Sequence, residues 1–152
     1  MRTIKFKAKR LDIGEWIYGY LIYFVDGMYI FDNGCNLMHV DPNTICQFTG
    51  FQDMEGNEIY EGDILASDCI YPLYLLDIRS RDESNPNYVG VVIWNEHSGS
   101  FELKMHKNGI IQGYDCFVGK SCSFNKTFAT EYEVIGSIHD PEWQQKLNLK
   151  TE

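Results

Sequence analysis

Residues 47–65, with the sequence QFTGFQDMEGNEIYEGDIL, limit the possible folds of this chain more than any other segment. They contain two tight turns, at residues 54–57 and 61–63. Gly56 suits the first turn because glycine adopts a positive φ at little steric cost. The runs beside and between the turns are too short for helices. We therefore expect short strands at residues 44–48, 59–60 and 64–66.

Alternating apolar and polar side chains predict strands in much of the remaining chain. The clearest strand is residues 88–94, which an expected turn at 95–99 joins to a return strand at 101–105. A short helix is expected at residues 141–147, where Pro141 follows Asp140 as a helix cap. The other expected strands are residues 4–9, 15–24, 28–31 and 131–138.

The fold class that follows from these elements is mainly β. Closely spaced short strands with tight turns are typical of a small barrel or a sandwich, and this pattern fits a barrel of about five strands. Additional hairpins and the short C-terminal helix would lie outside the barrel. No repeat or low-complexity tract marks a boundary, so residues 1–152 are predicted to form a single domain.

Charge is distributed unevenly along the chain, whose formal net charge is −9. The first ten residues contain the cations Arg2, Lys5, Lys7, Lys9 and Arg10. Residues 11–102 contain sixteen acids but only Arg79 and Arg81 as bases, which gives a net charge of −14. Such a surface repels a phosphate backbone, so nucleic acid could bind only at the N-terminal strand or the C-terminal third.

The chain has five cysteines, Cys35, Cys46, Cys69, Cys116 and Cys122. Their number is odd and none has C-x-x-C spacing, so the sequence indicates neither a disulfide framework nor a zinc site. The charged N-terminus has no apolar signal core, and no apolar run approaches the roughly 20 residues of a membrane helix. We expect a cytoplasmic protein with reduced thiols, no membrane contact and no cofactor.

The N-terminal strands carry two candidate binding surfaces. Residues 15–24 are apolar on both faces, and their aromatic row is more typical of a core or an oligomer contact than of a ligand platform. This aromatic row consists of Trp16, Tyr18 and Tyr20. A basic row could follow a phosphate backbone, with Tyr18 or Tyr20 as a stacking surface. The basic row consists of Lys5, Lys7 and Lys9.

The basic row also has a structural interpretation, which we favour. Lysines on an edge strand deter the pairing of one sheet with another, and aggregation is thereby reduced. They could equally pair with the acidic remainder of the chain, within one molecule or across a subunit contact. Either role would leave the lysines without a ligand.

Several patterns resemble catalytic or metal sites without meeting their requirements. Residues 113–121, GYDCFVGKS, have five residues between the glycines, whereas a phosphate-binding loop has four. The acidic residues Glu55, Glu58, Glu61 and Asp63 could offer oxygens to Mg²⁺ or Ca²⁺, but they do not match an EF-hand loop and are interpreted as solvated turns. Glu96 with His97, and Cys116 with His106, are interpreted as surface or structural residues.

The turn-rich block also resembles a known family. Gln47-Phe48-Thr49-Gly50, Asp53, Gly56 and the run IYEGDI ending at Ile64 are similar to the signature QFTGL-x-D-x-x-G-x-x-IYEGDI of the YopX family of phage and prophage proteins. Phe51 replaces the usual Leu. Residues 4–8, 90–94 with Phe101, and 133–138 resemble the family's opening strand, central hairpin and closing strand. The resemblance spans about residues 4–142 and leaves about 66–87 and 107–129 as variable loops.

The resemblance implies a mainly β structure with a small SH3-like barrel and assembly into oligomers. It brings no established activity and no catalytic residues. We therefore expect a non-enzymatic binding or self-assembly module of a mobile element, whose partners are its own copies or a phage or host protein. A nucleic-acid-binding barrel is the alternative, and a metal-dependent hydrolase is the least favoured function. The nucleic acid would contact Lys5, Lys7 and Lys9, together with Lys104, Lys107 and Lys120.

Overall fold

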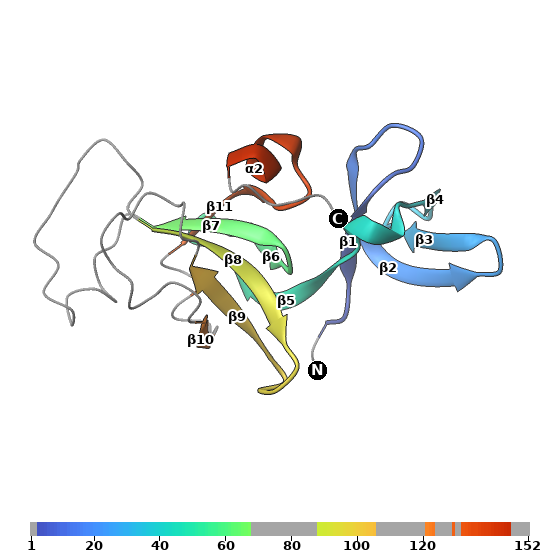
Figure 1. Ribbon diagram of the computed structural model, residues 1–152. Helices are drawn as coiled ribbons and strands as arrows, with labels where there is room; N and C mark the ends of the chain where they lie inside the picture. Colours follow the sequence, from blue (N-terminus) through green and yellow to red (C-terminus); the bar gives the residue numbers. More distant parts are fainter. Residues whose placement is uncertain (1–2, 68–87, 106–120, 124–128, 130–131, 147–152) are drawn as a thin grey trace, which may run out of the picture. The chain divides into compact units, whose positions relative to one another are not determined.

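The computed structural model describes residues 3–67, 88–105, 121–123, 129 and 132–146 (Figure 1). Within these residues the chain is mainly β, and its strands form two antiparallel sheets. Contacts divide the chain into two compact units, residues 1–50 and 51–152. A compact unit need not fold independently, so the single domain expected for residues 1–152 stays a prediction.

The first sheet has the strand order β4-β3-β2-β1-β5-β6. Its strands are β1 (Phe6–Lys9), β2 (Trp16–Phe24), β3 (Gly27–Phe31), β4 (Leu37–His39), β5 (Cys46–Gln52) and β6 (Glu58–Tyr60). A two-residue turn joins Phe24 to Gly27, which are directly opposite each other in β2 and β3. Asp26-Gly27 is a sequence signal for such a hairpin.

The core of the first unit lies on one face of this sheet. Ala8, Ile30 and Val40 are completely buried there, and further apolar side chains pack against them. These further side chains are Phe6, Ile17, Leu21, Met28 and Ile45. Gly19 also faces this side, and a Cβ at this position would collide with the backbone carbonyl of Phe31. The sequence therefore needs glycine in the middle of an otherwise bulky strand.

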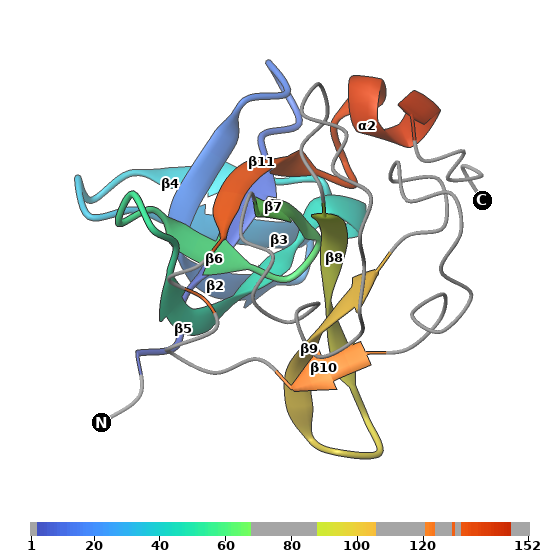
Figure 2. The same cartoon turned by 90° about the vertical axis from the view of Figure 1, so that its left-hand side faces the viewer.

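The second sheet has the strand order β10-β9-β8-β7-β11, and Figure 2 shows β8, β9 and β10 beside one another. Its strands are β7 (Asp63–Ser67), β8 (Tyr88–Asn95), β9 (Ser100–Met105), β10 (Ser121–Ser123) and β11 (Glu133–Ser137). In the described residues neither sheet closes into a barrel. The mainly β class is thus confirmed, whereas the SH3-like barrel is not.

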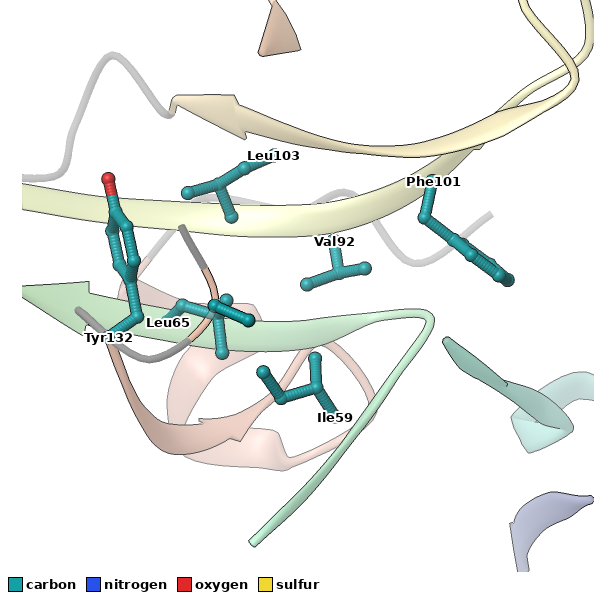
Figure 3. Packing of buried hydrophobic residues seen from close by; sticks show 7 residues of the cluster. Ile59, Leu65, Val92, Phe101, Leu103 and Tyr132 are labelled. Carbon is teal, nitrogen blue, oxygen red and sulfur yellow. The ribbon is translucent and has the colours of Figure 1, made fainter. Parts of the chain in front are cut away.

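The main core of the second unit is a cluster of buried side chains around β7, β8 and β9 (Figure 3). Its labelled members are Ile59, Leu65, Val92, Phe101, Leu103 and Tyr132. All of them are at most 5% exposed. Burying each such side chain contributes about 1.5–3 kcal/mol, so this cluster is the main source of stability in the unit.

The expected C-terminal helix is present as α2 (Pro141–Lys146). Six residues are too few for a stable isolated helix, so α2 depends on tertiary contacts. Trp143 packs against a second cluster around Ile64 and Val91, and its indole Nε1–H donates to the Ile135 carbonyl at 3.2 Å. Gly136 makes room for the indole, because a Cβ there would collide with the Trp143 ring.

Two short strands differ from the expectations. β4 was not predicted, and β10 lies in the variable loop expected at about residues 107–129. Each has only three residues, which is too short to show a period of two in the sequence. β5 begins later than expected because Pro42–Thr44 forms a 3-10 helix. Most of the expected loops, at residues 66–87 and 107–129, lies outside the described residues.

A buried carboxylate, that of Asp53, fixes the turn between β5 and β6. Its Oδ1 accepts the N–H groups of Glu55 at 2.9 Å and Asn57 at 2.8 Å. Its Oδ2 accepts the side-chain amide of Asn57 at 3.1 Å and the N–H of Val134 in β11 at 3.0 Å. The same side chain therefore shapes the turn and attaches the last strand to it.

The next turn, between β6 and β7, is joined to the same unit through its backbone. Gly62 has a φ of 77°, as a tight turn requires. Its N–H donates to the Val92 carbonyl at 2.8 Å, and its carbonyl accepts the N–H of Ile138 at 2.9 Å. Asp63 is completely buried and accepts the Tyr60 N–H at 2.8 Å. Both turns of the block at residues 47–65 are thus part of the framework of the second unit.

Replacing Asp53 by alanine should lower the free energy of unfolding by about 3 kcal/mol, because several buried N–H groups would lose their acceptor. Urea denaturation followed by circular dichroism measures this loss. Asp12→Ala is the control, since Asp12 is exposed and its ion pair with Arg10 lies at the surface. Its effect should be much smaller, because an ion pair in solvent contributes little to stability. Equal effects of the two substitutions would contradict the role given to Asp53.

The stabilising effect of Asp53 should also depend on pH. Burial alone raises the pKa of Asp53, but hydrogen bonds from Val134, Asn57 and Glu55 outweigh it and leave the pKa below its ordinary value. A lowered folded-state pKa gives stability that is present above the unfolded pKa of about 3.9 and is lost as the pH falls through the folded pKa. The urea midpoints of the wild type and Asp53→Asn should therefore converge below about pH 4. A difference between the two urea midpoints that stays constant from pH 7 to pH 2 would contradict this expectation.

Candidate functional site

The basic row lies on an interior strand of the first sheet. β1 pairs with β2 on one side and with β5 on the other, and Lys7 is opposite both Tyr18 and Cys46. The interpretation of these lysines as edge-strand protection is therefore wrong, because β1 has a hydrogen-bonded neighbour on each side. Sequence alone could not show this, since the strands beside β1 are set by pairing with residues about ten and forty positions away.

The basic row and the aromatic row share one face of the sheet. Lys7 is opposite Tyr18, and Lys9 is opposite Trp16. Residues directly opposite each other in an antiparallel pair point to the same side, and every second residue along a strand does so too. The basic row and the aromatic row, which were predicted as two separate surfaces, therefore form a single surface. We call it the aromatic face. It includes Lys7, Lys9, Trp16 and Tyr18, Tyr20 at the next position of β2 on this side, and Lys5, whose Nζ lies over the ring of Phe48 in β5.

The lysines of the aromatic face lie against aromatic rings. The Nζ atoms of Lys7 and Lys9 are 4.6 Å and 5.1 Å from the ring centroid of Trp16. The Nζ of Lys5 is 4.9 Å from the centroid of Phe48 in β5. A cation over an aromatic face is attracted by the ring quadrupole. Lys7 is only 6% exposed, so this ammonium group is part of the packed structure.

The aromatic face continues across β3 and β4. Tyr29 is opposite His39, and their rings stack with centroids 4.6 Å apart. Phe24 meets Tyr29 edge to face, with centroids 5.3 Å apart. The Tyr29 hydroxyl donates to Asp26 at 3.0 Å, and this hydrogen bond, together with burial, raises the pKa of Tyr29. The rings of β2, β3 and β4 therefore form one connected surface.

Sequence reasoning placed the aromatic row of β2 correctly within a strand but missed this continuation. Met28 and Ile30 point to the core, so Tyr29 between them must point to the opposite face. The strand expected at residues 28–31 could therefore have predicted the position of Tyr29. His39 had no such signal, because the three residues of β4 are too few to show a period of two.

Much of the aromatic face is open to solvent. Tyr18 is 50% exposed, Tyr20 is 54% exposed and Phe24 is 48% exposed. The opposite face of β2 contributes Ile17 and Leu21 to the core. This division explains why residues 15–24 are apolar on both faces. Large exposed apolar patches on proteins are frequently binding or association surfaces.

The acidic residues around the second turn do not behave as a group of solvated side chains. Asp63 is completely buried, so that interpretation is wrong for this residue. Glu61 is partly buried, and its burial raises the pKa more than a hydrogen bond from the Trp94 N–H lowers it. Among the residues that the structure describes, no group of three or more His, Cys, Asp or Glu side chains could hold a metal ion.

The remaining candidates fall partly within and partly outside the described residues. Glu96 and His97 are exposed in the turn between β8 and β9, where the side chain of Asn95 accepts the His97 N–H at 2.9 Å. Cys46 is buried and Cys35 is exposed. Lys104 is exposed on β9. The loop at 113–120, the Cys116–His106 pair, Lys107 and Lys120 fall outside the described residues.

Comparison with known proteins identifies related sequences and folds. A family model described as "YopX protein" matches residues 26–142. A solved structure, protein EF1440 from Enterococcus faecalis, is similar over 97% of this chain and 99% of that chain, with 20% identity and a TM-score of 0.50. At this identity the likeness concerns the fold alone. No curated protein matches the chain. None of the helices in the described residues has the length and apolar character that a membrane span requires.

Proposed function

The chain belongs to the YopX family, and from this premise we propose that it is a non-enzymatic module that binds and assembles through the aromatic face of its first sheet. The observation that carries the proposal is the half-exposed state of Tyr18 and Tyr20 beside the ring of Trp16. Tyrosine and tryptophan are enriched at interfaces because they bury a large, stiff surface and keep a polar group for hydrogen bonding.

The distribution of charge supports association through the first unit. Residues 1–50 contain five acids and five bases, whereas residues 51–152 contain seventeen acids and eight bases. Two strongly acidic surfaces repel each other, so copies of the chain approach more easily through the neutral unit. The tyrosines lie in that unit. Self-association is accordingly the preferred form of binding, and a phage or host protein is the other partner class.

We also propose that the second unit contains a small SH3-like barrel. The last strand of the second sheet, β11, pairs with the first strand of that sheet, β7, while β8, β9 and β10 follow in sequence order. A sheet that brings its first and last strands together in this way is compatible with a small SH3-like barrel. The same proposal places the protein in the cytoplasm and gives it a role in a phage or prophage.

Light scattering should show that the wild-type protein is larger than a monomer at high concentration. The double variant Tyr18→Ser and Tyr20→Ser should shift the protein toward monomer, because it removes two rings from the aromatic face without touching the core face. Ile13→Ser is the control, since Ile13 is equally exposed at 54% but lies in the turn before β2. A wild-type monomer at high concentration would overturn the proposal of self-assembly.

Nucleic-acid binding is the second candidate, and one observation favours it. Lysines and tyrosines share the aromatic face, and single-stranded nucleic acids bind proteins through stacking combined with phosphate contacts. The burial of Lys7 and the acidic second unit count against this function.

A titration with single-stranded and double-stranded DNA and RNA at low salt tests the second candidate. If it is right, binding weakens with salt with a slope set by the number of phosphates neutralised, and Lys5→Gln with Lys9→Gln reduces that slope. No binding to any of these nucleic acids at low salt would exclude this function.

A further inference from the structure

One edge of β2 continues past the end of its neighbour β1. β1 covers β2 only as far as Gly19, which is opposite Phe6. β3 pairs with the other edge of β2 from Tyr20 to Phe24. The segment of β2 that follows Tyr20 therefore has a strand on one side only, within the part of the chain that the structure describes.

The hydrogen bonds of β3 show which backbone groups of β2 point toward the uncovered side. The carbonyl of Met28 accepts the N–H of Val40, so Met28 directs its backbone groups toward β4. Its partner Tyr23 is then in a pair without mutual hydrogen bonds, and the N–H and C=O of Tyr23 point away from β3. Backbone N–H and C=O groups point to alternate sides along a strand. Those of Leu21 therefore point away from β3 as well, while those of Ile22 and Phe24 point toward β3.

The chain before β1 does not complete this edge. Continuing the register beyond Phe6 and Gly19 would place Ile4 opposite Leu21, but β1 begins at Phe6. Residues 3–5 are not in a strand, and the segment ahead of β1 runs away from the hairpin of β2 and β3 (Figure 1). The two donors and two acceptors of Leu21 and Tyr23 thus form a short open edge in the described structure.

This open edge lacks the charges, prolines and bulges that protect many sheet edges. Natural sheet edges are protected by charged residues, prolines or bulges. Residues 16–25, WIYGYLIYFV, contain no charge and no proline. Tyr23 is 71% exposed, and Val25 at the tip of the hairpin is completely exposed. An uncharged edge with large exposed side chains is suited to pairing with another strand.

We propose that this edge pairs with the same edge of a second copy of the chain. An antiparallel pair centred on Ile22 places Leu21 of one copy opposite Tyr23 of the other, and every donor then meets an acceptor. A contact of one surface with itself closes as a two-fold dimer. The neutral charge of residues 1–50 permits this approach, whereas the acidic second unit would resist it.

The inference rests on the proposed self-assembly and specifies its geometry. A two-fold axis perpendicular to the sheet keeps equivalent faces on the same side. The aromatic faces of the two copies would therefore join into one surface across the new strand pair. Tyr20 and Phe24, which lie on either side of Ile22 on that face, would come from both copies at its centre.

Tyr23→Pro tests the edge directly, because it removes an N–H that β3 does not use. Proline is tolerated where the N–H of an edge strand faces solvent. The variant should fold, with an unchanged circular dichroism spectrum, and its dimer dissociation constant should rise at least about tenfold. Tyr23→Ala keeps the N–H and therefore shows how much of any change comes from losing the tyrosine side chain alone. Ile22→Pro removes an N–H that β3 does use and should disrupt the hairpin.

Ile22→Cys provides a second test that does not depend on proline. At the two-fold axis the two substituted positions have Cα atoms about 4.5 Å apart, within the range of a disulfide. Mild oxidation should give a covalent dimer, and peptide mapping should find position 22 linked to position 22. Ile13→Cys, at an exposed site in the turn before β2, should not give the equivalent link.

The outcomes separate the inference from the proposed function. Loss of the dimer in Tyr23→Pro, together with the cross-link at position 22, supports edge pairing. A dimer that survives Tyr23→Pro and lacks the cross-link overturns edge pairing, and self-assembly through the tyrosines then stands if Tyr18→Ser with Tyr20→Ser still dissociates it. A wild-type protein that is monomeric at high concentration overturns both.

Discussion

The hydrogen bonding of one buried carboxylate joins the signature turn of the second unit to its last strand. Asp53 is 3% exposed, and a carboxylate so deeply placed must replace its lost water by other donors. Three of its four hydrogen bonds come from its own turn, and the fourth comes from Val134 in β11. β11 pairs in turn with β7, which supplies Leu65 to the core. The turn, the last strand and the core are therefore connected through this one side chain. The family signature is accordingly structural in this chain, because its acidic residues satisfy backbone N–H groups.

In the first unit, one face of the sheet forms the core and the other face forms an exposed aromatic surface. One face carries small and branched side chains that close a core around Ile30 and Val40. The other face carries rings that remain half exposed, and lysines that lie against those rings. A core needs side chains that fill a fixed volume, whereas a binding surface needs broad, stiff groups that can be covered later. The same strand, β2, meets both needs because its side chains alternate.

Local features of the fold could be predicted from the sequence, and its pairings could not. The turn glycine Gly56 and the strand at residues 88–94 follow from short-range rules. The positions of Lys7 and Asp63 do not. Lys7 was placed on an edge strand, but β5 covers that edge through a pairing some forty residues distant. Asp63 was expected in solvent, but its burial depends on where β7, β8 and β11 meet. The candidate site was likewise found in two parts, since only strand register shows that the lysines and the aromatic residues share a face.

The bond between Asp53 and Val134 joins residues 81 positions apart, and this separation has a consequence for synthesis. A ribosome adds about 5–20 residues per second, so Val134 is made roughly 4–16 seconds after Asp53. During that interval the nascent chain holds a carboxylate that lacks one of its donors and a strand, β7, that lacks its outer neighbour. The N-terminal unit, residues 1–50, is by then fully translated. Translation order thus lets the aromatic face form before the acidic unit is complete, and the growing polypeptide could meet its own neighbours on a polysome through that face.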